Sequence, residues 1–150
     1  MKIGVTGTRN GMTFHQMTAV TRELRQRLQC APNWNDAELH HGDCQGVDVH
    51  VAAIAQGLGY VTVAHPPTND YHRAFHNSTH VLPPQHYLDR NKSIVDTVDV
   101  LLVVPLTPEE RQRSGTWFTY RYANRVGRDV VVFLPDGRIS RELRKVSDYR

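Results

Sequence analysis

The sequence has few of the features that mark secreted, zinc-binding or membrane proteins. Among its 150 residues are only two cysteines, Cys30 and Cys44, and their spacing matches neither a disulfide framework nor a zinc-binding pair. No apolar run approaches the roughly 20 residues that a membrane-spanning helix needs. The N-terminal residues predict a strand instead of a signal peptide. We therefore expect a cytoplasmic protein with no membrane partner.

Net charge is also low outside the C-terminal end. The formal net charge is +3, and residues 138–150 carry a matching excess of basic over acidic side chains, so the rest of the chain is balanced. A basic tail can contact nucleic-acid phosphates, but a solvated terminal segment is the more common outcome. Nucleic acid is therefore a less favoured partner than a small molecule.

Hydrophobic residues make up 39% of the chain, which suits one folded domain over residues 1–150. Short apolar runs predict strands at residues 2–6, 37–41, 60–64, 98–104 and 129–134. Helical spacing of apolar residues, with Thr13 as a first N-cap, predicts helices at residues 14–29, about 47–58, 86–97 and 114–126. Valine-rich strands that alternate with helices indicate a three-layer α/β fold. Its mainly parallel sheet of about five strands is covered by helices on both faces.

Three stretches share one arrangement, in which a strand leads through a glycine-containing loop into a helix. They are Gly7-Thr8-Arg9, Gly42-Asp43-Cys44-Gln45-Gly46-Val47-Asp48 and Ser114-Gly115-Thr116. In a parallel sheet these loops meet at the carboxyl edge, where ligands bind. Glycine lets a ligand approach the backbone, and a helix N-terminus attracts an anion, most often phosphate. We therefore expect a nucleotide-like phosphate ligand at this edge, with no metal and no cofactor.

The order of these motifs resembles that of the SLOG superfamily. The matching residues are His41-Gly42-x-x-x-Gly46-x-Asp48, then Arg90-Asn91, then an apolar strand, then Gly115-Thr116 before a helix. The superfamily includes the DNA-processing protein A fold and the Lonely Guy phosphoribohydrolases. The chain is most similar to its small stand-alone members with a Gly-Gly-Ala-Arg-Gly-Ala-Asp-like loop. The resemblance covers roughly residues 1–134 and implies a Rossmann-like fold, a nucleotide-derived ligand and a homo-oligomer.

The predicted ligand site combines the three loops with the Arg90-Asn91 pair. Its residues are Gly7, Thr8, Arg9, Gly42, Asp43, Cys44, Gly46, Asp48, Arg90, Asn91, Ser114, Gly115 and Thr116. Structural roles stay open for some of them: Asp48 as a first-turn residue of its helix, and Arg90 as a surface ion-pair partner of Asp89 or Asp96. Cys44 lies near a predicted helix N-terminus, where the pKa of a thiol tends to fall.

The stretch around Gly115-Thr116 departs from the sequence of the enzymes in this group. In the Lonely Guy enzymes a Pro-Gly-Gly-x-Gly-Thr-x-x-Glu stretch supplies phosphate contacts and a catalytic glutamate. Gly115-Thr116 match it, but Thr119 stands at the glutamate position and the preceding Pro-Gly-Gly is missing. Cleavage of an N-glycosidic bond needs a carboxylate, which Asp43, Asp48 or another acid would have to supply.

We therefore predict a protein that binds a nucleotide or nucleotide-derived signalling molecule, as a sensor or a sequestering protein. The first alternative is an N-glycoside hydrolase, a phosphoribohydrolase acting on nucleoside monophosphates, so whether the protein is an enzyme stays open. The second alternative is a nucleic-acid binder of the DNA-processing type, which the basic tail favours.

Residues 65–85 show neither helical nor strand periodicity, and a loop of this length is usually functional or mobile. We expect a lid that offers Tyr71, His72, Arg73 and His76 to the ligand. His72, His76 and His80 recur every four residues, but neither a helical period nor a carboxylate at the customary spacing supports a zinc site.

The last prediction concerns the aromatic residues after the third loop. Trp117-Phe118, with Tyr120 and Tyr122, is the expected contact surface of the oligomer. Trp117 and Tyr120 are also candidates for stacking on a base.

Overall fold

The computed structural model describes residues 1–142. Part of the predicted basic tail, including Arg144, Lys145 and Arg150, lies outside the described residues. Within the described chain, none of the helices is both long and apolar enough to cross a membrane.

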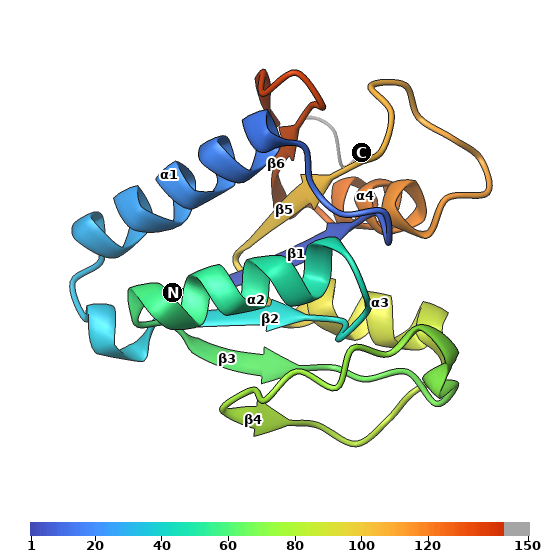
Figure 1. The fold of residues 1–150 in the computed structure, drawn as a ribbon, viewed down its shortest axis with the longest axis horizontal. Helices are drawn as coiled ribbons and strands as arrows, with labels where there is room; N and C mark the ends of the chain where they lie inside the picture. Colours follow the sequence, from blue (N-terminus) through green and yellow to red (C-terminus); the bar gives the residue numbers. More distant parts are fainter. Residues whose placement is uncertain (143–150) are drawn as a thin grey trace.

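Seven strands form one sheet in the order β4-β3-β2-β1-β5-β6-β7. Their bounds are β1 Lys2–Gly7, β2 Glu38–His41, β3 Val61–Ala64, β4 His80–Val81, β5 Val100–Val104, β6 Asp129–Phe133 and β7 Ile139–Glu142. Strands β1 to β6 run parallel to their neighbours, and only the edge strand β7 is antiparallel. Because β1 and β5 are paired at the centre of the sheet, their carboxyl ends lie side by side (Figure 1).

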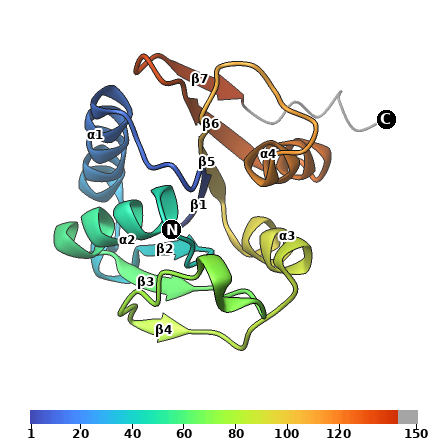
Figure 2. The same cartoon turned by 45° about the vertical axis from the view of Figure 1, so that its right-hand side comes forward.

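Four helices cover the two faces of this sheet. They are α1 Phe14–Cys30, α2 Val47–Leu58, α3 Tyr87–Thr97 and α4 Gly115–Arg125. Helices α1 and α2 lie on one face and α3 and α4 on the other (Figure 2). Short 3-10 turns at Trp34–Asp36 and Asp70–His72 complete the elements. The predicted three-layer α/β fold with a mainly parallel sheet is therefore confirmed.

The sheet has two more strands than the five that the sequence predicted, although a short strand or helix after Asp136-Gly137 was left open. β4 has two residues within the predicted loop 65–85, and β7 follows the turn at Asp136-Gly137. Neither carries a run of apolar residues, because both strands lie at an edge of the sheet. Their pairing depends on the neighbouring strand more than on their own sequence.

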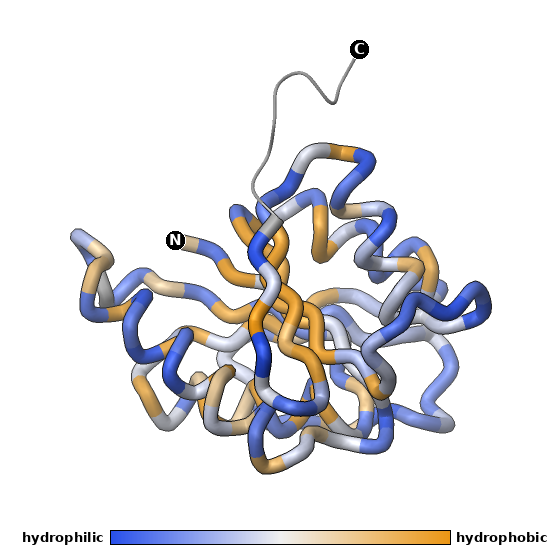
Figure 3. Tube along the Cα trace, turned by 90° about the horizontal axis from the view of Figure 1, so that it is seen from above, coloured by the Kyte–Doolittle hydropathy of each residue, from blue (hydrophilic) through white to orange (hydrophobic). Residues whose placement is uncertain are grey.

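The core is divided by the sheet into two apolar layers. Ile3, Val5 and Leu102 face α1 and α2, whereas Leu101 and Val103 face α3 and α4. Every residue of β5 is buried, which explains why this strand is the most apolar run of the sequence. Figure 3 shows the hydrophobic stretches gathered in the strands at the centre of the molecule.

A buried amide fixes the start of α1 to the edge of the sheet that holds the site. Thr13 is the N-cap, as predicted, and forms a capping box with Gln16. Nε2 of Gln16 donates to the carbonyl oxygens of Pro105 and Phe133 at 2.9 Å each. The ends of β5 and β6 and the loop after β1 are therefore held at a fixed separation.

Candidate functional site

A cavity of about 360 Å³ lies at the carboxyl edge of the sheet. It is bordered by the loops after β1 and β2, the first turn of α3 and the long loop between β5 and α4. The chain leaves β1 toward β2 on one side and returns to β5 on the other, so the strand order reverses here. Open α/β sheets bind their ligands at such a point, and the volume lies in the range of small-molecule sites.

The structure brings most of the predicted site residues together around this cavity. Those that line it are Gly7, Thr8, Arg9, Cys44, Asp48, Arg90, Asn91, Ser114, Gly115 and Thr116. Gly42, Asp43 and Gly46 are not among the lining residues, although all three lie in the loop that the sequence pattern emphasised most.

The N-terminus of α4 presents free donors to the cavity. The side chain of Ser114 caps the helix and accepts from the N–H of Trp117 at 3.3 Å. Within the described chain, the N–H groups of Gly115 and Thr116 have no hydrogen-bond partner, and both residues line the cavity. The N–H of Arg9, across the cavity in the loop after β1, is also without a partner among these residues. Free N–H groups at the positive end of a helix dipole attract an anion.

The loop between β2 and α2 is closed by comparison. All four N–H groups of residues 42–45 are already bonded, and their acceptors are Asp48 Oδ2, His41 Nδ1 and the carbonyl oxygen of His72. Gly46 adopts a φ of 88°, and a Cβ there would lie 2.4 Å from the carbonyl oxygen of Arg9. This glycine therefore lets two loops pack against each other and leaves no room for a phosphate.

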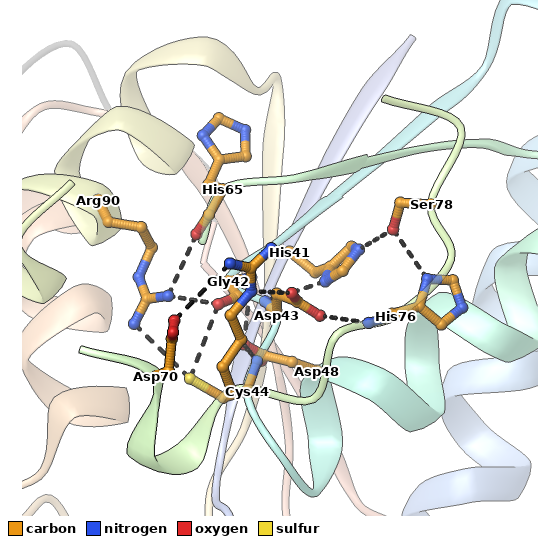
Figure 4. Close-up of polar contacts among 11 residues, drawn as sticks. His41, Gly42, Asp43, Cys44, Asp48, His65, Asp70, His76, Ser78 and Arg90 are labelled. Carbon is orange, nitrogen blue, oxygen red and sulfur yellow. Dashed lines mark hydrogen bonds and ion pairs between the residues drawn. The ribbon is translucent and has the colours of Figure 1, made fainter. Parts of the chain in front are cut away.

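Gly42 makes space for two charged side chains. A Cβ at this position would lie 2.7 Å from Nη1 of Arg90 and 2.9 Å from Oδ2 of Asp48. Nη1 of Arg90 donates to the carbonyl oxygens of Gly42 and His65 (Figure 4). Nε of Arg90 donates to Oδ1 of Asn91 at 2.7 Å. Arg90 is only 5% exposed. The alternative of a surface ion pair is therefore wrong, and most of this guanidinium is used to hold the loop.

Asp48 is the one acidic side chain among the described residues that line the cavity. Its Oδ2 accepts from the N–H groups of Gly42 at 3.1 Å and Cys44 at 3.3 Å. Burial raises the pKa of Asp48 to about 6, although Arg90 and these two N–H groups oppose the shift. The carboxyl group is therefore largely ionised at neutral pH.

The thiol of Cys44 is not activated. Burial, together with the negative charge of Asp48, raises the pKa of Cys44 to about 11, even though the guanidinium of Arg90 lies near its sulfur atom. The expectation of a lowered pKa at a helix N-terminus is therefore wrong, because desolvation and the neighbouring carboxylate outweigh the helix dipole.

Asp43 binds the 65–85 segment and does not point into the cavity. Its Oδ2 accepts from Nε of Arg73 at 2.9 Å, and its Oδ1 accepts from the N–H of His76 at 2.9 Å. The N–H of Ala74 donates to the Asp43 carbonyl at 2.7 Å. We call residues 70–78 the strap. None of the four residues expected to close over a ligand lines the cavity, because the strap is fixed to the far side of the loop.

Three buried histidines lie behind the loop. Nδ1 of His40 is 2.8 Å from Nε2 of His65, and its Nε2 is 2.8 Å from Oε1 of Glu38. Nε2 of His41 lies 2.8 Å from Oγ of Ser78. Burial lowers the pKa of His41 to about 3, that of His65 to about 4, and that of His40 below its ordinary value. All three are therefore neutral at pH 7.

The histidines of the predicted periodic run do not share one helix face. His72 lies in a 3-10 turn and His80 in β4. Across residues 1–142, no group of three or more His, Cys, Asp or Glu side chains is placed to hold a metal ion.

Thr119, at the position of the Lonely Guy glutamate, faces the protein interior. It is 1% exposed, and its hydroxyl donates to the Gly115 carbonyl at 2.8 Å. Thr119 is not among the residues that line the cavity, and a glutamate here would place a carboxylate at a buried position. We therefore expect Thr119→Glu to destabilise the fold.

The predicted oligomer surface is largely used within the chain. Trp117 is 4% exposed and contacts Tyr120 edge to face at a centroid separation of 5.1 Å. The hydroxyl of Tyr122 donates to Asp96 at 2.8 Å. The most exposed large apolar side chains on the helices are instead Phe14, Met17 and Tyr87.

Sequence analysis missed several residues that line the cavity. They are Thr6, Asn10, Tyr87, Leu106, Thr107, Arg111, Arg113 and Trp117, the last of which was considered for stacking and for the oligomer contact. Most come from the loop between β5 and α4 or from residues beside predicted ones. Their signal was the charge of residues 105–113 next to a glycine-containing helix start.

Comparison with known proteins supports the fold. Neither a protein-family model nor a curated protein matches this sequence. Among solved structures, DNA processing protein A from Streptococcus pneumoniae matches with a TM-score of 0.64 and 21% identity, over 87% of this chain and 49% of that chain. The chain thus spans about half the length of that protein.

Two further structures match similarly. The molybdenum cofactor binding protein from the phototrophic bacterium Rippkaea orientalis gives a TM-score of 0.62 and 18% identity, over 87% of this chain and 74% of that one. DNA processing protein A from Helicobacter pylori, described for its single-stranded DNA binding mode, gives a TM-score of 0.61 and 18% identity, over 88% of this chain and 64% of that one. The chain shares the Rossmann-like fold of these structures, and the resemblance is confirmed at the level of the fold alone.

Proposed function

We propose that this protein binds a nucleotide or nucleotide-derived signalling molecule in the cavity at the carboxyl edge, as a sensor or a sequestering protein. The observation that carries this proposal is that, among residues 1–142, the N–H groups of Gly115 and Thr116 at the start of α4 have no partner. Arg9 also lines the cavity, and its N–H has no partner among the described residues. A phosphate group suits such a set of donors.

The charge around the cavity supports an anionic ligand. Four arginines line it, Arg9, Arg90, Arg111 and Arg113, against the single carboxylate of Asp48. Arg90 is buried and mostly engaged, whereas the other three are exposed. The exposed arginines would attract a phosphorylated ligand through long-range electrostatic forces, which salt weakens.

The mouth of the cavity offers apolar surface for a base. Tyr87 is 52% exposed and Leu106 is 54% exposed, and both line the cavity. A base stacked on an aromatic ring gains about 1–3 kcal/mol with little dependence on its identity. Tyr87 therefore replaces Trp117 as the proposed stacking residue.

The structural neighbours support ligand binding in a general sense. One is named for binding the molybdenum cofactor and another for binding single-stranded DNA. Both ligands carry phosphate, so a phosphate site is compatible with either. We include both ligand types in the test below.

A hydrolase acting on nucleoside monophosphates is the second candidate. The observation that favours it is Asp48, a carboxyl group at the cavity whose pKa of about 6 suits proton transfer near neutral pH. Asp43 is a poor alternative because both of its oxygens already accept hydrogen bonds. A nucleic-acid binder ranks third, because two of the tail arginines are already paired with acidic side chains. Arg138 pairs with Asp136, and Arg141 pairs with Glu23.

The test is incubation of the purified protein with mononucleotides, cyclic nucleotides, ADP-ribose derivatives, molybdopterin and a single-stranded oligonucleotide. Mass spectrometry of the retained and released fractions then identifies bound and altered compounds. An intact nucleotide in the retained fraction is the expected result. Free base with ribose phosphate in the released fraction would establish the hydrolase, and retention of the oligonucleotide alone would establish the nucleic-acid binder.

Two glycine variants make the test specific for the site. A Cβ at Gly115 or at Gly57 would meet no atom within 4 Å, so the first side-chain atom of a leucine fits at either position. Gly115 lines the cavity, whereas Gly57 lies in α2 away from it. Gly115→Leu should abolish retention and Gly57→Leu should preserve it. Equal retention by both variants would place the ligand elsewhere.

We also propose a homo-oligomer, now through α1 instead of α4. Phe14 is 74% exposed and Met17 is 43% exposed on one face of this helix. Light scattering of the wild-type protein and a Phe14→Ser variant tests this. A monomeric wild-type protein at all concentrations would contradict it.

A further inference from the structure

The two oxygens of Asp48 have different surroundings. Oδ2 accepts both backbone hydrogen bonds, from Gly42 and Cys44, whereas Oδ1 has no partner in residues 1–142. No side-chain nitrogen or oxygen that is sealed inside the described chain lacks a partner. Since the Asp48 side chain lines the cavity and is 7% exposed, Oδ1 is the oxygen that the cavity reaches.

This free oxygen is held in a fixed place. The backbone bonds to Oδ2 fix the carboxyl plane, and Gly42 provides the space in which Asp48 and Arg90 lie together. Figure 4 shows Asp48 beside Cys44 and Gly42 at the base of the loop. The charged groups that face Asp48 are Arg90 from α3 and Asp43 from its own loop. A carboxylate fixed in this way is suited to recognising a donor at one point.

The chemistry of Oδ1 selects among possible ligand groups. An ionised carboxylate accepts hydrogen bonds and repels phosphate, so it marks a part of the cavity that does not hold the anion. The anion-attracting donors belong to α4 and Arg9, on other elements. A ligand that satisfies both sides needs a phosphate and, within the same small molecule, a hydrogen-bond donor. A phosphorylated sugar with free ring hydroxyls has this combination.

We propose that Oδ1 of Asp48 accepts a hydrogen bond from a ring hydroxyl of the ligand's sugar, so that the protein selects ribonucleotide-type ligands over analogues without these hydroxyls. This inference rests on the function proposed above. Asp48 is then a specificity-determining residue. A site built to pair with a hydroxyl rejects a ligand that lacks it, because the buried acceptor is left without a partner.

The experiment is calorimetric titration of the wild-type protein with matched nucleotide pairs. The probes are adenosine, guanosine and uridine 5′-monophosphates and their 2′,3′-dideoxy counterparts. The expected result is that a ribonucleotide binds at least about tenfold more tightly than its dideoxy counterpart. Equal binding of the two members would overturn this inference and leave the proposed function standing. Binding of neither member of any pair would also overturn this inference, and the proposed function would then be decided by the cyclic nucleotides and ADP-ribose derivatives of the panel.

An Asp48→Asn variant separates recognition from structural damage. The asparagine oxygen can still accept from the loop N–H groups, but the negative charge is lost. We expect the preference for the ribonucleotide to fall below about threefold, while the affinity for inorganic phosphate rises because a nearby negative charge is removed. A variant that binds phosphate more weakly but keeps the tenfold preference would contradict the inference, since that pattern indicates damage to the fold alone.

Discussion

The two helix starts at the cavity look alike in sequence and differ in structure. In the loop before α2 the N–H groups of residues 42–45 are all bonded within the chain, whereas at the start of α4 those of Gly115 and Thr116 have no partner in the described part of the chain. Both follow a parallel strand and both contain glycine. The difference is that Asp48, His41 and the strap supply acceptors to the first loop, and no equivalent acceptors reach the second. A glycine-containing loop therefore indicates a site only where its donors are left unpaired.

The closed loop should be the fragile side of the comparison, and Arg90 is its central residue. Arg90→Ala would leave two buried carbonyl oxygens without their donor and the Asp48 carboxylate without a neighbouring positive charge. We expect a loss of at least about 3 kcal/mol in the free energy of unfolding. Urea unfolding followed by circular dichroism measures it. A stable variant that loses only ligand binding would show that Arg90 is a ligand contact first.

The next largest effect should come from replacing a glycine by alanine in each of the two loops. Gly46→Ala places a Cβ 2.4 Å from a backbone oxygen at a φ of 88°, so we expect a loss of about 3 kcal/mol. Gly115→Ala meets no atom within 4 Å and should leave stability unchanged within about 0.5 kcal/mol. Thermal unfolding of both variants provides the comparison. Equal losses would remove the distinction between the loops.

Acid should act on the closed side as well. His41 and His65 have pKa values lowered to about 3 and about 4, so between pH 6.5 and 4 they bind protons in the unfolded state but not in the folded state. Stability therefore falls as the pH falls through this window. Asp48 opposes this between its ordinary pKa of 3.8 and about 6, since its folded form holds a proton there.

The free energy of unfolding should therefore fall by about 1.4 kcal/mol or more for each pH unit between pH 6 and 4. Urea unfolding at several pH values measures it. In a His41→Gln variant this slope should decrease by about 1.4 kcal/mol per pH unit, the contribution of one proton. An unchanged slope in that variant would mean that His41 is not held neutral by burial.

The smallest effect should come from releasing the strap. Arg73→Ala removes the ion pair with Asp43 at 2.9 Å but leaves the backbone bonds between the loop and the strap. Since Asp43 is buried and Arg73 half-buried, we expect a loss of about 1–2 kcal/mol. Hydrogen exchange should become faster in residues 70–78 and stay unchanged at α4. Faster exchange at α4 would show that the strap supports the open side too.

Sequence patterns were sufficient for the layers of the fold, because buried parallel strands are continuous apolar runs and the surrounding helices keep their period. The sequence did not predict β4, because its two exposed residues carry no pattern of their own. At the site, the pattern located the loops but not the direction of the side chains. Asp43 and Asp48 are five residues apart, yet one binds the strap and the other faces the cavity.

The same limit explains Cys44 and Thr119. The pKa of the Cys44 thiol depends on burial and on Asp48, neither of which is a property of the local sequence. Thr119 aligns with a catalytic position of other proteins but points into the core. Contacts between distant segments, such as Arg90 with Gly42, decided which residues remain available to a ligand.

The central claim is that the anion binds at the start of α4 and not in the loop before α2. The most direct measurement is a titration of the ¹⁵N-labelled protein with inorganic phosphate, and then with the nucleotide retained in the panel, followed through backbone amide shifts. We expect saturable shifts at Gly115, Thr116 and Arg9, with little change at residues 42–45. Shifts confined to residues 42–45, with Gly115 and Thr116 unmoved, would contradict the account.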